Sequence, residues 1–168
     1  MHQNNLQRAI SCVTDAVLTI SDVSAVNAPQ PTRALTISFK NDDPVRLRAR
    51  QPLAITVFQR IRIELDNGFS RRSWQVAVTD YDYILRVPDG QEIVAYQWVS
   101  TGSSRITHPH LHIGRGATGN VTTFGPRGLH RIHFPTRHII LEDVLRLAIT
   151  EFGVEPRRPD WEHILGGS

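Results

Sequence analysis

The sequence predicts an α+β fold, in which an antiparallel sheet of roughly six or seven strands carries an N-terminal helix and C-terminal helices. Apolar residues recur at helical spacing near both ends of the chain, and mainly at every second position between residues 34 and 138. The length of 168 residues and the hydrophobic content of 40% are typical of one domain with a real core. We therefore predict a single domain over residues 1–168.

The first predicted element is an amphipathic helix or arm over residues 3–20. Five apolar residues fall in one narrow stripe of a helical projection: Leu6, Ile10, Val13, Val17 and Ile20. Pro29 and Pro31 then indicate a loop before the first strand. Such an arm could also pack on a second copy of the chain.

Residues 34–138 are predicted to be mainly strands. From Leu35 onward apolar and polar residues alternate, and turn sequences separate the runs at residues 41–44, 66–68 and 88–90. This arrangement is typical of an antiparallel meander with one solvated face.

Helices are predicted again over residues 141–165. One stripe contains Leu141, Val144, Leu145, Ala148, Ile149 and Phe152. Gly153 follows, where a left-handed C-cap is common, and residues 159–160 introduce a short closing helix through Leu165.

Six of the eight histidines lie between residues 107 and 138. On a strand, alternating histidines project from one face about 6 to 7 Å apart, which is a chemical surface rather than a packing pattern. We expect one convergent site, with these candidate catalytic residues: His108, His110, His112, His133 and His138. A purely structural role in hydrogen-bond networks is the alternative.

Two kinds of centre fit this pattern. In the first, the histidines hold a divalent transition metal ion. The outer pair of three alternating histidines would lie about 13 Å apart, so a ligand must come from elsewhere. His110 with one neighbouring histidine, plus His133 or His138, would be feasible, and the candidates are His110, His112 and His133. In the second there is no cofactor, and one histidine acts as nucleophile or base while another acts as acid. The lack of carboxylates nearby in the sequence disfavours Mg²⁺ or Ca²⁺.

Charge is segregated along the chain. Residues 93–141 contain five arginines and no Asp or Glu, while the remainder has a net charge of −2. This pattern predicts an anionic partner, RNA or a nucleotide. The candidate phosphate-binding residues are Arg105, Arg131 and Arg137, because a guanidinium is the better bidentate partner for phosphate.

The stretch His-Pro-His-Leu-His-Ile-Gly at residues 108–114 resembles the signature of the histidine-triad nucleotide hydrolases, in which three histidines alternate with hydrophobic residues. The likeness reaches upstream through Gly102-Ser-Ser, and Pro109 departs from the pattern. The resemblance implies that the middle histidine, His110, attacks an α-phosphate.

A second likeness covers more of the chain. A tyrosine-rich strand at residues 81–86, a hairpin, a Pro-His-rich segment, the stretch 133–138 and the helix from Leu141 look like the small TumE-type toxins of bacterial toxin–antitoxin pairs. The adjacent paired histidines of that family are lacking here. The likeness implies an RNA-directed activity and a cognate antitoxin.

Together these patterns predict a histidine-dependent enzyme acting on RNA or nucleotide phosphates, of which a toxin–antitoxin-type ribonuclease is the most specific form. The alternatives are a histidine-triad-like nucleotide hydrolase, and a non-enzymatic module that binds nucleic acid or protein. Homo-oligomerisation is a further expectation.

The start of the sequence has no apolar signal core, and no run approaches the roughly 18 apolar residues that span a bilayer. Cys12 is the only cysteine, which excludes an intrachain disulfide and favours a reducing compartment. We therefore expect a cytoplasmic protein with no membrane partner.

Overall fold

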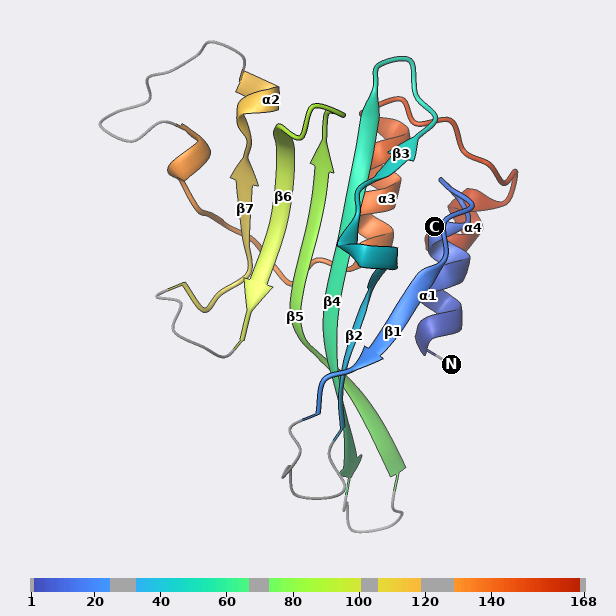
Figure 1. Ribbon diagram of the computed structural model, residues 1–168, viewed down its shortest axis with the longest axis vertical. Coiled ribbons are helices and arrows are strands. Elements are labelled where there is room, and N and C mark those ends of the chain that lie inside the picture. The colour runs from blue at the N-terminus through green and yellow to red at the C-terminus, as the bar shows by residue number, and fades with distance from the viewer. Residues whose placement is uncertain (1, 25–32, 67–72, 101–105, 119–128, 167–168) are drawn as a thin grey trace.

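A computed structural model describes residues 2–24, 33–66, 73–100, 106–118 and 129–166 (Figure 1). Its helices are α1 (His2–Ile10), α2 (Arg115–Thr118), α3 (Leu141–Thr150) and α4 (Trp161–Ile164), with 3₁₀ turns η1 (Lys40–Asp42) and η2 (Leu129–Arg131). Its strands are β1 (Leu18–Asp22), β2 (Arg33–Phe39), β3 (Val45–Leu47), β4 (Leu53–Asp66), β5 (Ser73–Arg86), β6 (Glu92–Val99), β7 (His110–Ile113) and β8 (Phe134–Pro135).

The strands of the described residues form one sheet in the order β1-β2-β4-β5-β6-β7-β8, with β3 paired to β4 off this path. Every pair is antiparallel. The predicted α+β class is confirmed, and the short β3 and β8 bring the sheet to eight strands.

The predicted helix over residues 3–20 is wrong in its second half. The helix α1 ends at Ile10, and β1 runs antiparallel to β2. Leu6, Ile10 and Val13 are buried as the stripe predicted, but Val17 is 67% exposed. The helical period continued by coincidence into β-branched residues, which favour strands when a partner strand is available.

The side chain of Gln7 stabilises the reversal between α1 and β1. Its amide nitrogen donates to the carbonyl of Ala16 (3.1 Å), and its amide oxygen accepts from the backbone N–H of Leu18 (2.8 Å). These hydrogen bonds satisfy backbone groups that a continued helix would have paired internally.

The strand β5 runs without interruption from Ser73 to Arg86, but it contains a β-bulge. Arg60 of β4 pairs with Asp80 and the next residue, Ile61, pairs with Val78, so Thr79 is an extra residue in β5. Such a bulge reverses the alternation of faces. Val78 and Tyr81 therefore both point to the same side of the sheet.

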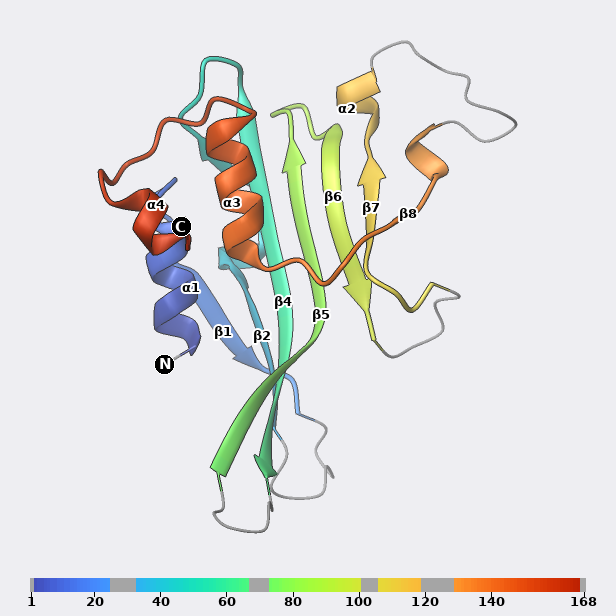
Figure 2. The ribbon, with the colours of Figure 1, turned by 180° about the vertical axis from the view of Figure 1, so that it is seen from behind.

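The helices α1, α3 and α4 pack together, with α3 lying over β4 and β5 on one side of the sheet, which we call the α3 face (Figure 2). The core here joins buried residues of α3, such as Leu141 and Leu145, to Val57, Tyr83 and Leu85 of the sheet. The C-terminal helices are thus where the sequence predicted them. Gly153 has a positive φ of 66° just after α3, as the expected C-cap requires.

The opposite side of the sheet carries a row of polar side chains. Asp82 of β5 pairs with Gln97 of β6, which pairs with His110 of β7, and cross-strand partners point to the same side. Tyr81, next to Asp82, points to the α3 face, where its hydroxyl accepts a hydrogen bond from the N–H of Ile139 (3.2 Å). We call the side with Asp82, Gln97 and His110 the histidine face.

Among the described residues, the helices are all too short or too polar to cross a membrane.

Candidate active site

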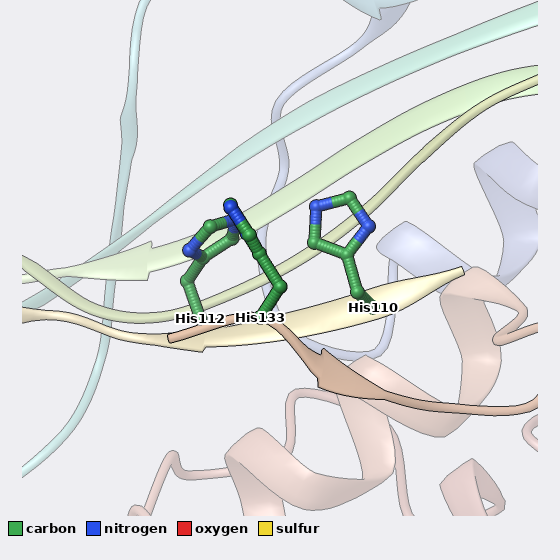
Figure 3. Close-up of side chains that lie close together, drawn as sticks. All are labelled: His110, His112 and His133. Carbon is green, nitrogen blue, oxygen red and sulfur yellow. The ribbon is translucent and has the colours of Figure 1, made fainter. Parts of the chain in front are cut away.

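Three histidines converge on the histidine face (Figure 3). His110 and His112 project from β7, and His133 lies between η2 and β8, where the chain returns antiparallel to β7. The ring centroids are 4.9 Å apart for His110 and His112, 5.0 Å for His110 and His133, and 4.2 Å for His112 and His133. One nitrogen from each ring lies within 4.8 Å of the others. These three residues, which we call the histidine cluster, are those that the sequence nominated as metal ligands.

The His110 ring is held by its own strand. It is 7% exposed, and its Nδ1 lies 2.9 Å from the carbonyl oxygen of His108. Because a carbonyl only accepts, Nδ1 carries the proton and Nε2 carries the lone pair. This arrangement is typical of metal-binding and of catalytic imidazoles, since it fixes both the tautomer and the ring orientation.

His108 itself contributes its carbonyl rather than its ring to this arrangement. Its side chain is exposed, with its ring centroid 6.0 Å from that of His110, and it lies outside the group of three converging nitrogens. A catalytic role for the His108 imidazole stays a prediction.

The surroundings of His133 favour its neutral form. Burial lowers the pKa of its imidazole, and the neighbouring His110 and His108 lower it further because a second positive charge is unfavourable there. Its Nδ1 is buried and has no hydrogen-bond partner among the residues that the structure describes. A buried nitrogen without a partner is uncommon, and in a histidine cluster it indicates an atom available to a ligand.

An open pocket of about 370 Å³ adjoins the histidine cluster. Its walls include the apolar side chains of Val99 and Ile106 and the polar side chains of Asp82 and Gln97. A second pocket, lined by Glu92, His112, Gly114 and Arg115, also reaches the cluster. His112 therefore lines both pockets.

Asp82 is the site residue that sequence reasoning missed. The Gln97 amide donates to its Oδ1 (3.1 Å), and burial raises the pKa of the carboxyl, an effect that this hydrogen bond partly offsets. Residues 93–141 contain no acidic residue, but the fold places the carboxylate of Asp82 beside His110 in the same pocket. The available signal was an aspartate between two tyrosines in a strand, where Asp is normally depleted.

The structure does not bring His138 into the histidine cluster. Its ring contacts those of Tyr81 (5.1 Å between centroids) and Trp98 (4.4 Å), both in edge-on geometry. Trp98 follows Gln97 in β6, so it points to the opposite side from His110. The expected single site therefore includes His133 but not His138, because the chain after β8 crosses to the α3 face (Figure 2).

The three candidate phosphate-binding arginines are also separated. Arg105 lies outside the described residues. Arg131 is exposed at the end of η2, two positions before His133. Arg137 is exposed and lies 3.5 Å from Asp143 of α3, a carboxylate that also pairs with Arg146. Asp143, in the first turn of α3, therefore lies between two arginines.

Comparisons with protein-family models, with curated proteins and with solved structures found no match for this chain.

Proposed function

We propose that this chain is a metal-dependent phosphoesterase acting on RNA or nucleotide phosphates, with a divalent transition metal ion on His110, His112 and His133. The observation that carries the proposal is the convergence of three imidazole nitrogens within 4.8 Å. Around a tetrahedral ion with metal–nitrogen bonds of about 2.0 to 2.1 Å, ligand nitrogens are roughly 3.3 Å apart. Small rotations of the side chains would close that difference.

The donor set favours a particular class of ion. Imidazole suits zinc and its neighbours among the transition metals, whereas Mg²⁺ and Ca²⁺ prefer oxygen ligands. The lone pair on Nε2 of His110 and the neutral state of His133 both suit metal binding, which requires deprotonated nitrogens. Three protein ligands leave one position for water, as in catalytic rather than structural zinc sites.

This coordination suits hydrolysis. When bound, such an ion would lower the pKa of its bound water to about 7 and would polarise a phosphoryl oxygen. The open pocket beside the cluster gives a substrate access to that position. Phosphate is the favoured substrate group because residues 93–141 hold five arginines and no acidic residue. Arg131 is the candidate nearest in sequence to the cluster.

A metal-free mechanism is the second candidate, and the hydrogen bond of His110 favours it as well. With Nδ1–H donating to the His108 carbonyl, Nε2 of His110 is free to act as nucleophile or base. His112, whose ring is 4.9 Å away, would then act as the acid. This candidate corresponds to the role that the histidine-triad resemblance implies for His110.

Metal removal separates the two candidates. The purified protein is treated with EDTA, and hydrolysis of labelled RNA, of a nucleotide and of bis(p-nitrophenyl) phosphate is measured before and after Zn²⁺ or Mn²⁺ is added. We expect activity to disappear with the chelator and to return with the metal. Activity that persists in chelator would support the metal-free mechanism.

Single alanine variants of the histidine cluster provide the matched test of the ligands. His110→Ala, His112→Ala and His133→Ala should each lose high-affinity Zn²⁺ binding in calorimetry. His138→Ala and the exposed His163→Ala should keep it. RNA binding without any turnover, with or without metal, would instead identify a non-enzymatic binding module.

A further inference from the structure

The histidine cluster continues into a hydrogen-bonded polar row across three strands. Asp82, Gln97 and His110 are successive cross-strand neighbours on β5, β6 and β7. All three line the pocket beside the cluster. Central strands of a sheet rarely carry an aspartate, so its position needs a compensating role.

The two oxygens of the Asp82 carboxylate differ in their surroundings. Oδ1 accepts the hydrogen bond from the Gln97 amide, at 3.1 Å. That is the only hydrogen bond of the Asp82 carboxylate among the described residues, so Oδ2 accepts none from them. The carboxylate is thus oriented through Oδ1, and Asp82 lines the pocket beside the cluster.

From this placement we propose that Asp82 is a catalytic residue, the general base for the attacking water, and that Gln97 is its positioning residue. The inference rests on the proposed phosphoesterase function and deepens it. Asp82 Oδ2 takes one proton from the water as the water oxygen forms its bond to phosphorus. The bond from phosphorus to the leaving oxygen breaks, and the same proton passes from Asp82 to that oxygen. The products are a phosphate monoester and an alcohol, with Asp82 restored.

Two other carboxylates near this region make useful comparisons. Glu92 lines the neighbouring pocket beside His112, so it is the rival candidate for the base. Asp80 is buried two residues before Asp82 on the same strand, where it pairs with Arg60 at 3.4 Å and accepts a hydrogen bond from Thr79. Asp80 does not line the pocket. If only the substitution of Asp82 lowers kcat, the loss therefore results from the position of Asp82 in the pocket and not from the removal of a buried carboxylate in β5.

The test uses the full chain loaded with Zn²⁺ and bis(p-nitrophenyl) phosphate as substrate. Asp82→Asn should lower kcat by about 10² to 10⁴. Its Kd for Zn²⁺ should stay within a few fold of the wild-type value, and Asp80→Asn should keep wild-type kcat. Formate should restore part of the rate to Asp82→Ala, because the smaller side chain leaves room for an external carboxylate, and should not restore it to Asp82→Asn.

Several results would overturn the proposal. A wild-type kcat in Asp82→Asn would show that Asp82 is not the general base. If Glu92→Gln loses the rate instead, Glu92 is the general base. Loss of Zn²⁺ affinity as large as that of His133→Ala makes Asp82 a metal ligand rather than a base. If the wild-type protein hydrolyses no phosphodiester with any metal, the proposed function fails and the role of Asp82 fails with it.

Gln97→Leu keeps the proposal testable if the Asp82 variants do not fold. It leaves the carboxylate in place but removes the hydrogen bond that orients it. We expect kcat to fall about tenfold or more, toward the lower range for loss of acid–base catalysis, while KM and the Kd for Zn²⁺ stay unchanged. An unchanged kcat in Gln97→Leu would contradict the orienting role.

Discussion

The two faces of the sheet take their histidines from one short stretch of sequence and use them differently. On the histidine face, His110, His112 and His133 lie ring against ring beside an open pocket. On the α3 face, His138 packs edge-on against Tyr81 and Trp98, in an aromatic group that adjoins the core. The surroundings of a histidine therefore depend on the face it occupies, and the five positions that separate His133 from His138 are enough for the chain to change sides.

The largest expected effect comes from substituting a histidine on the histidine face, which should remove both metal binding and turnover. His133→Ala should reduce hydrolysis at least 10²-fold, because an open ion site with two remaining protein ligands holds its metal poorly. The thermal midpoint of the metal-free protein should change little, since the buried Nδ1 of His133 makes no hydrogen bond within the described part of the chain. His138→Ala is the control and should keep both metal and activity. Equal losses of metal and activity in His133→Ala and His138→Ala would show that the two faces do not differ in function.

A cavity on the α3 face should lower the stability of the protein and leave its metal binding unchanged. Leu145 is fully buried between α3 and the sheet, and Leu145→Ala should lower the free energy of unfolding by about 2 to 5 kcal/mol. Chemical denaturation measures the change. The affinity of the folded variant for Zn²⁺ should match that of the wild type, because Leu145 lies on the other side of the sheet. A lowered affinity would show that the two faces are coupled.

Substituting two glycines compares the faces again, at a smaller magnitude. A Cβ at Gly114 would lie 1.9 Å from the carbonyl oxygen of Glu92, so Gly114→Ala must push β6 and β7 apart beside His112. We expect a cost of about 1 to 3 kcal/mol and weaker Zn²⁺ binding. Gly153→Ala meets open space but keeps a φ of +66°, so its cost of about 1 kcal/mol is backbone strain after α3. Its Zn²⁺ affinity should not change.

The arginines give a comparison in binding rather than stability. Arg131→Ala should weaken RNA binding by a few fold and reduce the salt dependence by about one unit of slope, as expected for one lost phosphate contact. Arg137→Ala should have a smaller effect, because Arg137 lies beside Asp143 on α3. Fluorescence titrations at several salt concentrations measure both. If Arg131→Ala changes neither the affinity for RNA nor the salt dependence, Arg131 makes no phosphate contact, and the abundance of arginine reflects the composition of the sequence only.

The smallest effect is a dependence of stability on pH in the metal-free protein. Burial lowers the pKa of His133 and of His138 in the folded state, whereas an unfolded imidazole titrates near 6.5. As the pH falls below about 6.5 the unfolded state binds protons first, so stability falls until the lower folded pKa values are passed. Denaturation between pH 5 and 8 should show this loss. The profile should be flatter in His133→Ala and in His138→Ala, and a stability that rises as pH falls would contradict the sign.

Much of the fold was predictable because local periodicity reports which side of an element is buried. The stripe from Leu141 to Phe152 predicted α3, and the alternation after Leu35 predicted the antiparallel sheet. The same argument failed for residues 3–20, where Ile20 pairs with Ile37 of β2. A periodic pattern does not reveal that a partner strand is available, and the partner decided the conformation.

The α+β class, the charge asymmetry and a histidine group that includes His110, His112 and His133 were predictable from the sequence, because strand alternation and hairpin return are local properties. Three placements could be learned only from the folded chain: His138 lies on the other face, Arg137 pairs with Asp143 of α3, and Asp82 and Gln97 line the pocket beside the cluster. These placements depend on the register between strands far apart in the chain. Register is set by the packing of the whole sheet against its helices, and no short stretch of sequence contains it.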